Sequence, residues 1–216
     1  RMIVPGHLAR KDVLETFPAF SAGGDRIFYC SADTVSLPGD ILDLKYSLNS
    51  VSFNAETGEC GTDVEVLREG VSVCHPKASP DGRFLVYTIA GYGTFPIWHT
   101  ECDLEMMELG TGRIISMEPA NSDRSDTYHS WSSNSRWLVF ASKRGDGQYG
   151  KPFFCHIGED GSVSKPFVLP QKDPSFYEKT LKSFNIPDLS SSSVGFGYKT
   201  IGRIWKDVPA EPFGAN

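Results

Sequence analysis

A nine-residue segment occurs three times in this chain, and no other feature of the sequence restricts the possible fold as strongly. The copies begin at Ser21, Ser79 and Ser132, so they lie 58 and 53 residues apart. A second landmark recurs downstream as Thr57-Gly58, Thr111-Gly112 and Asp160-Gly161. Its copies lie 54 and 49 residues apart, so the two landmarks move together. Two landmarks with one shared period indicate a repeat architecture.

Each copy of the segment combines a hairpin turn with a covered strand. In the second copy, Pro80 sits at the first corner of the turn, where its fixed φ fits, and Gly82 sits where a positive φ is needed. A continuous apolar run follows each turn, as in Phe84 to Tyr87, and this pattern indicates a strand covered on both faces. The Thr-Gly or Asp-Gly landmark then separates two further strands. Each unit is therefore expected to be an antiparallel sheet of about four strands.

Radially stacked β-propeller blades meet this description, because each blade is covered by two neighbours. We predict an all-β chain, a β-propeller of four-stranded antiparallel blades at approximately 15–70, 71–125 and 126–170. A short helix is expected at 174–184, and the partial propeller spans 1–189, with 1–14 completing a neighbouring blade. Residues 190–216, rich in Ser and Gly, are expected to form an extended tail or linker. Propellers have about four to eight blades, so we expect the ring to be completed by a longer chain or a second copy.

Composition narrows the range of partners. The 216 residues contain 27 acidic and 21 basic side chains, a formal net charge of −6, which argues against a nucleic-acid surface. No apolar run approaches the roughly 20 residues of a transmembrane helix. The five cysteines show no C-x-x-C spacing, so we expect buried hydrophobic side chains rather than a structural zinc site. Whether Cys60 and Cys74 pair is left open.

The repeat resembles that of TolB-like, WD-repeat-like β-propellers. The resemblance rests on Ser79-Pro80-Asp81-Gly82-Arg83 with its apolar strand, and on the stretch from His129 to Trp137, which is similar to a subgroup common in Bacteroidetes. Leu169 to Pro174 and Asn185-Ile186-Pro187 are similar to the ending of that subgroup, so the resemblance covers roughly 15–188. It implies an exported, periplasmic or envelope-associated protein whose usual role is binding rather than catalysis.

Candidate site residues lie just before each repeated turn. Phe17-Pro18, His75-Pro76 and Tyr128-His129 occupy equivalent places in the repeat. The first strand of a propeller blade lines the central channel, so His75, Tyr128 and His129 are expected to converge there. Converging imidazoles can bind a metal or act as a base. The alternative is that these rings cap a strand edge and satisfy backbone groups.

The loops after each second strand supply further candidates, because variable loops on a rigid scaffold commonly carry binding residues. The second loop is aromatic, and Trp98 with His99 is suited to stacking on a sugar ring or a peptide. Packing against the next blade is the alternative. The third loop is short and basic, and Arg144 is its candidate ligand contact.

Two functional hypotheses follow. The chain lacks a Gly-x-Ser-x-Gly elbow and a dinucleotide fingerprint, so we assign no catalytic residue, no metal ligand and no cofactor. The leading hypothesis is a non-catalytic binding or scaffold propeller of the bacterial cell envelope that recognises a protein or glycan partner. The alternative is a metal-dependent propeller lyase or hydrolase acting on polysaccharide, with His75 and His129 at the channel.

Overall fold

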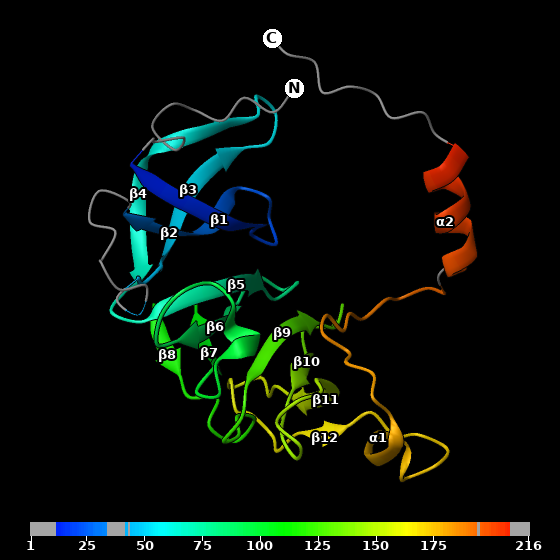
Figure 1. Ribbon diagram of the computed structural model, residues 1–216. Coiled ribbons are helices and arrows are strands. Elements are labelled where there is room, and N and C mark those ends of the chain that lie inside the picture. The colour runs from blue at the N-terminus through cyan, green and yellow to red at the C-terminus, as the bar shows by residue number, and fades with distance from the viewer. Residues whose placement is uncertain (1–11, 34–41, 43, 194, 208–216) are drawn as a thin grey trace.

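The computed structural model describes residues 12–33, 42, 44–193 and 195–207 and contains three four-stranded antiparallel sheets (Figure 1). The first sheet consists of β1 (Val13–Phe20), β2 (Arg26–Asp33), β3 (Ser47–Asn54) and β4 (Glu59–Arg68). The second consists of β5 (Ser72–Ala78), β6 (Phe84–Ala90), β7 (Asp103–Glu108) and β8 (Arg113–Ile115). The third consists of β9 (Asp126–Trp131), β10 (Trp137–Ser142), β11 (Lys151–His156) and β12 (Phe167–Val168).

The sheets are stacked as propeller blades. Within each sheet the strands pair in chain order, and the first strands β1, β5 and β9 contact one another in sequence along the inner edge (Figure 1). One apolar core lies between the first and second sheets, around Phe28, Leu48 and Tyr87. Another lies between the second and third, around Phe84 and Phe140. The predicted fold class, all-β with four-stranded propeller blades, is confirmed.

The repeated turn is held by its serine. Ser79 is fully buried, and its Oγ accepts a hydrogen bond from the Phe84 amide (2.9 Å) and donates one to Asp81 Oδ1 (2.6 Å). Ser132 makes the equivalent bonds with the Trp137 amide and with Asn134 Oδ1. Ser21 likewise accepts from the Arg26 amide, but its Oγ donates to Asp25, four residues on. These bonds start each covered strand at the same point of the repeat.

The chain beyond the third sheet differs from its predicted form. Helix α1 covers only Phe176–Lys179, within the predicted range 174–184, and Tyr177 anchors it by donating a hydrogen bond to the Leu169 carbonyl (3.1 Å). The segment expected to be an extended tail contains a second helix, α2 (Tyr198–Asp207). Of the expected strand at 1–14, residues from Val13 onward begin β1 of the first sheet, and 1–11 lie outside the described residues.

Two further expectations concern cysteines and membranes. All five cysteines are free, and only Cys60 is not fully buried, so Cys60 and Cys74 are not paired. In the described part of the chain, no helix is long and apolar enough to cross a membrane.

Candidate functional site

Each first strand contains a β-bulge at the same place in the repeat. In β5 the pairing register leaves His75 and Pro76 opposite the single residue Tyr87. The equivalent pairs are Phe17-Pro18 in β1 and Tyr128-His129 in β9. A bulge of this kind re-aims side chains relative to a regular strand and is a built feature rather than a defect.

The first residue of each bulge has left-handed backbone conformation. The φ angles are +53° at Phe17, +52° at His75 and +51° at Tyr128. A non-glycine residue in this region costs about 1–2 kcal/mol, because its Cβ crowds the following carbonyl. Three bulky residues share this conformation at equivalent positions, so the surrounding structure imposes it on every blade.

The three bulge residues form a continuous row of rings, which we call the inner ring row (Phe17, His75 and Tyr128). The ring centroids of Phe17 and His75 lie 4.3 Å apart, and those of His75 and Tyr128 lie 4.7 Å apart. Two of the predicted channel residues, His75 and Tyr128, therefore do meet. Burial, and then the nearby charge of Lys77, lower the pKa of His75 to about 4, so its ring is neutral at pH 7.

His129 does not join this row. Its side chain is fully buried, and its Nε2 donates a hydrogen bond to the Val86 carbonyl of the neighbouring blade (2.9 Å). Burial, followed by the charge of Lys77, lowers the pKa of His129 to about 3. The expected convergence of His129 with His75 at the channel is thus replaced by a contact between blades. The two residues of this bulge therefore have different surroundings: the Tyr128 ring contacts His75, whereas His129 is bonded to Val86.

Among the large hydrophobic side chains of the described residues, the most exposed one, Trp98, lies on the loop between β6 and β7. Trp98 is 80% exposed, and Phe95 beside it is also largely exposed. The short 3₁₀ helix η2 (Pro96–Trp98) holds them, with the Trp98 amide bonded to the Phe95 carbonyl (3.0 Å). Ser125 Oγ, at the start of the third blade, donates to the Pro96 carbonyl (3.1 Å) and fixes the loop from below.

His99 and Lys143 both lie close to this loop, one beneath it and one against the Trp98 ring. His99 is buried beneath it, where its Nδ1 lies 2.9 Å from Glu101 Oε1 and its ring meets Tyr92 edge-on at 4.3 Å. His99 therefore supports the loop from inside rather than standing next to Trp98 on the surface. Lys143, from the loop after β10, places its Nζ 5.5 Å from the Trp98 ring centroid, a cation–π contact. We call Phe95, Trp98 and Lys143 the Trp98 platform.

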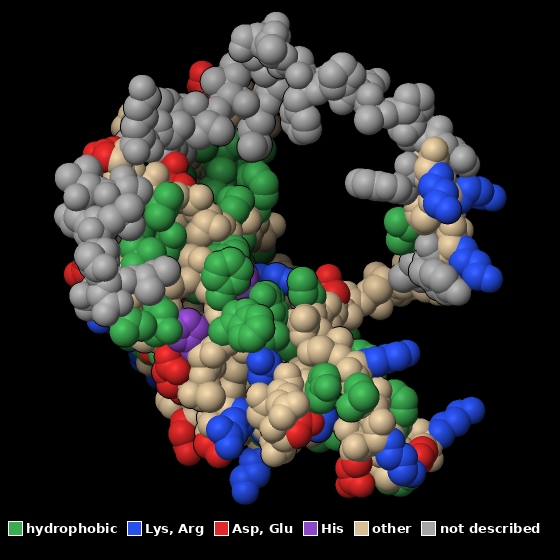
Figure 2. Space-filling model, in the orientation of Figure 1, with side chains coloured by type: hydrophobic (Ala, Val, Ile, Leu, Met, Phe, Trp, Pro, Cys, Tyr) green, Lys and Arg blue, Asp and Glu red, His purple; other side chains and the backbone are tan. Residues whose placement is uncertain are grey.

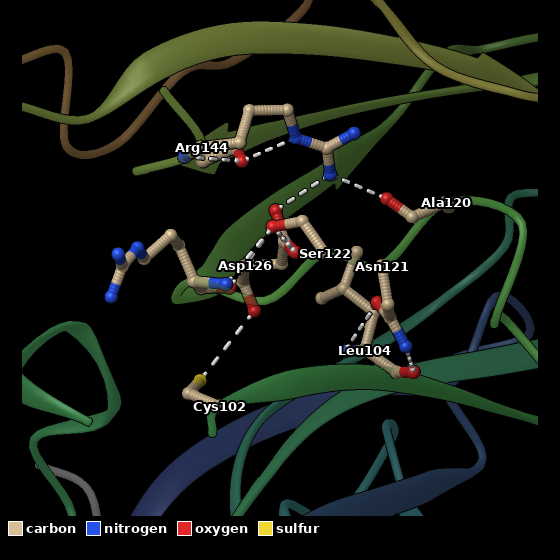
Figure 3. Close-up of polar contacts among 9 residues, drawn as sticks. Cys102, Leu104, Ala120, Asn121, Ser122, Asp126 and Arg144 are labelled. Carbon is tan, nitrogen blue, oxygen red and sulfur yellow. Dashed lines mark hydrogen bonds and ion pairs between the residues drawn. The ribbon is translucent and has the colours of Figure 1, made fainter. Parts of the chain in front are cut away.

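Arg144, the residue after Lys143, points inward (Figure 3). Its Nη2 contacts Asp126 Oδ1 at 2.8 Å and the Ala120 carbonyl at 2.5 Å, and its Nε donates to Ser142 Oγ at 2.7 Å. Asp126 is fully buried and also accepts a hydrogen bond from Ser122 Oγ (2.7 Å). The guanidinium of Arg144 thus holds the end of β10 against the start of β9 and the connection at 116–125 that precedes it, and Lys143 is the basic residue that this loop exposes.

The inner ring row and the Trp98 platform occupy different parts of the stack. His75 lies at the middle of β5, three residues from either end, so the ring row crosses the inner strands near their centres. The Trp98 platform lies at one end of the strands, because the β6–β7 loop follows Ala90, which pairs with Ser72 at the start of β5. Among the described residues, no group of three His, Cys, Asp or Glu side chains could hold a metal ion.

Comparisons with known proteins relate the chain to solved structures only. No family model and no curated protein matches it. It is similar to an oligogalacturonate lyase solved in complex with manganese, with a TM-score of 0.52, 11% identity, and coverage of 76% of this chain and 44% of that one. It is also similar to the β-propeller domain of the trilobed protease from Pyrococcus furiosus, with a TM-score of 0.45, 17% identity, and coverage of 75% and 44%.

A third similar structure is the Pyrococcus horikoshii acylaminoacyl peptidase, with a TM-score of 0.43, 16% identity, and coverage of 74% of this chain and 26% of the peptidase. The chain spans less than half the length of each of these proteins. At such identities the likeness shows the fold alone. The three stacked sheets are a run of propeller blades, and the neighbours include both peptidase propellers and a lyase.

Proposed function

We propose that this chain is a non-catalytic binding or scaffold module, part of a β-propeller of the bacterial cell envelope, that recognises a protein or glycan partner through the Trp98 platform. The envelope location rests on the resemblance of the repeat to TolB-like propellers. The exposed and supported Trp98 side chain is the observation that carries the binding role.

Trp98 has the features of a ligand contact rather than of a packing residue. A large aromatic side chain left 80% exposed forgoes most of the free energy that burial would supply. Its backbone is nevertheless held by η2 and by the hydrogen bond from Ser125, so little conformational entropy is lost when a ligand stacks on the ring. Lys143 adds a positive charge at the ring, which favours sugars or peptides that carry a carboxylate.

The proposal is tested by probing arrays of oligosaccharides and peptides with the 216-residue chain and measuring each hit by titration calorimetry. The Trp98→Ala variant should bind the hits at least about tenfold more weakly, because a buried tryptophan anchor is commonly an interface hot spot. Phe196→Ala, which also removes an exposed ring but lies outside the platform, is the matched control. Equal affinity of Trp98→Ala and wild type would contradict the proposal.

The alternative function is a metal-dependent polysaccharide lyase or hydrolase that uses channel histidines. Of the two histidines it requires, His75 lies in the inner ring row, whereas His129 is fully buried with its Nε2 bonded to Val86. The described residues do not assemble three metal ligands, so we derive no metal-dependent step. Release of unsaturated oligosaccharides from polyuronate, lost in His75→Ala and retained in Trp98→Ala, would favour this alternative over the binding role.

A further inference from the structure

Helix α2 stands apart from the three sheets. Figure 1 shows it beyond the last blade, at the end of the segment rich in Ser and Gly. At its first turn the amide of Thr200 donates a hydrogen bond to the carbonyl of Gly197 (2.9 Å). Its isoleucines are accordingly exposed: Ile201 is 57% and Ile204 is 55% accessible to solvent. Phe196, just before the helix, is also more than half exposed.

The sequence of α2 separates apolar and basic residues on opposite sides of the helix. With about 3.6 residues per turn, Ile201 and Ile204 fall on one side of the helix. Lys199, Arg203 and Lys206 fall together on the other side. Such a helix is strongly amphipathic, yet no other helix or strand of the described residues covers its apolar side.

The charge of α2 is opposite to that of the protein as a whole. The helix carries three basic residues and one acid, Asp207, whereas the chain has a formal net charge of −6. In Figure 2 the Lys and Arg side chains of this segment project freely into solvent. None of the three makes an ion pair within the described part of the chain. Their charge is therefore available to an anionic partner.

We propose that α2 binds the surface of an anionic lipid bilayer, lying in the interface with Ile201 and Ile204 inserted among the lipids. An exposed apolar side, a basic polar side and low overall hydrophobicity are the properties of interfacial helices. Ten residues form fewer than three turns, which supplies few anchors for a protein groove, whereas a lipid surface needs only shallow insertion. The acidic remainder of the chain is repelled by the same surface and stands away from it.

The experiment is co-sedimentation of the full chain with vesicles of phosphatidylcholine containing one quarter phosphatidylglycerol, and with vesicles of phosphatidylcholine alone. The chain should bind the anionic vesicles and bind the neutral ones much more weakly. Each Lys or Arg near an anionic surface strengthens binding about fivefold, so the triple variant Lys199→Gln, Arg203→Gln, Lys206→Gln should bind about a hundredfold more weakly. Ile201→Ser with Ile204→Ser should weaken binding at least about tenfold.

A matched control replaces Leu181 and Ile186 with serine. Both are exposed aliphatic residues outside α2, so this variant should bind vesicles as wild type does. All the substituted positions are exposed, so the variants should melt at the wild-type temperature. Circular dichroism of the wild-type chain should show added helix when anionic vesicles are present. Absence of binding to anionic vesicles, or equal loss in the control, would overturn the proposal. Self-association that Ile201→Ser with Ile204→Ser abolishes, without vesicle binding, would instead assign the helix to a second copy of the chain.

Discussion

Replacing Arg144 with methionine removes the cation that faces Asp126, the buried first residue of β9 in the third blade. Asp126 is fully buried and lies 2.8 Å from the guanidinium, so its charge would lose its ionic partner and keep only neutral donors such as Ser122. Breaking one side of a buried ion pair destabilises a protein by about 3–5 kcal/mol. For a chain of this size, the same change corresponds to a fall of about 6–20 °C in melting temperature.

Urea unfolding followed by tryptophan fluorescence, together with a thermal melt, measures this effect. Arg136→Met is the matched control, because Arg136 pairs with Glu159 at a comparable distance (2.7 Å) but Glu159 is largely exposed. An exposed pair of this kind contributes less than about 1 kcal/mol. The double variant Arg144→Met with Asp126→Asn should recover part of the lost stability, since it no longer buries an unpaired charge.

Unfolding of Arg144→Met at the same urea concentration as Arg136→Met would refute a stabilising role for this ion pair. Wild-type stability of Arg144→Met, together with lost affinity for a ligand that Trp98→Ala still binds, would instead give the guanidinium the recognition role that the sequence predicted.

His129, the serines of the repeated turn and Cys60 each allow a further test of the described burial. The pKa of His129 lies near 3 in the folded chain and near 6.5 when unfolded, so the unfolded state binds the extra proton and stability falls as the pH drops from about 7 to about 4. The free energy of unfolding should be about 3 kcal/mol lower at pH 4 than at pH 7. Urea midpoints measured across this pH range should fall less steeply for His129→Gln than for wild type. Ser79→Ala should cost about 1–2 kcal/mol in urea unfolding, and Ser21→Ala, at the exposed equivalent turn, clearly less. In the native protein a thiol reagent should modify Cys60 rapidly and the four buried cysteines slowly; more than one rapid equivalent would contradict the described burial.

The blades could be predicted because their signals are local. The turn around Ser79 and the covered strand after it are specified by residues within a few positions of one another, and the same local pattern occurs in all three copies of the repeat. Helix α2 was missed because Ser190 to Gly197 suggests a linker, and this composition hid the helical spacing of Ile201 and Ile204. A helical-period test on the tail would have found it.

The candidate site was predictable only in part. The repeat predicted that His75 and Tyr128 occupy equivalent positions on neighbouring first strands, but the contact of their rings depends on bulges that no short pattern indicates. Between Lys143 and Arg144, the inward residue is decided by Asp126, whose buried carboxylate lies on another strand. The direction of a side chain at such positions depends on contacts with residues distant in the sequence, whereas the presence of a loop or strand depends on residues nearby in the sequence.

The pairing of strands in chain order within every sheet bears on how a protein of this kind changes in length. A cut in the connections at 69–71 or 116–125 separates whole sheets and leaves no strand without its partner. A gene duplication or deletion with ends at these connections would therefore add or remove one complete blade, and its hydrogen-bonded ladders would stay intact. Only the contacts between neighbouring blades would need to adapt, which makes the single blade the natural step of evolutionary growth and of engineered truncation.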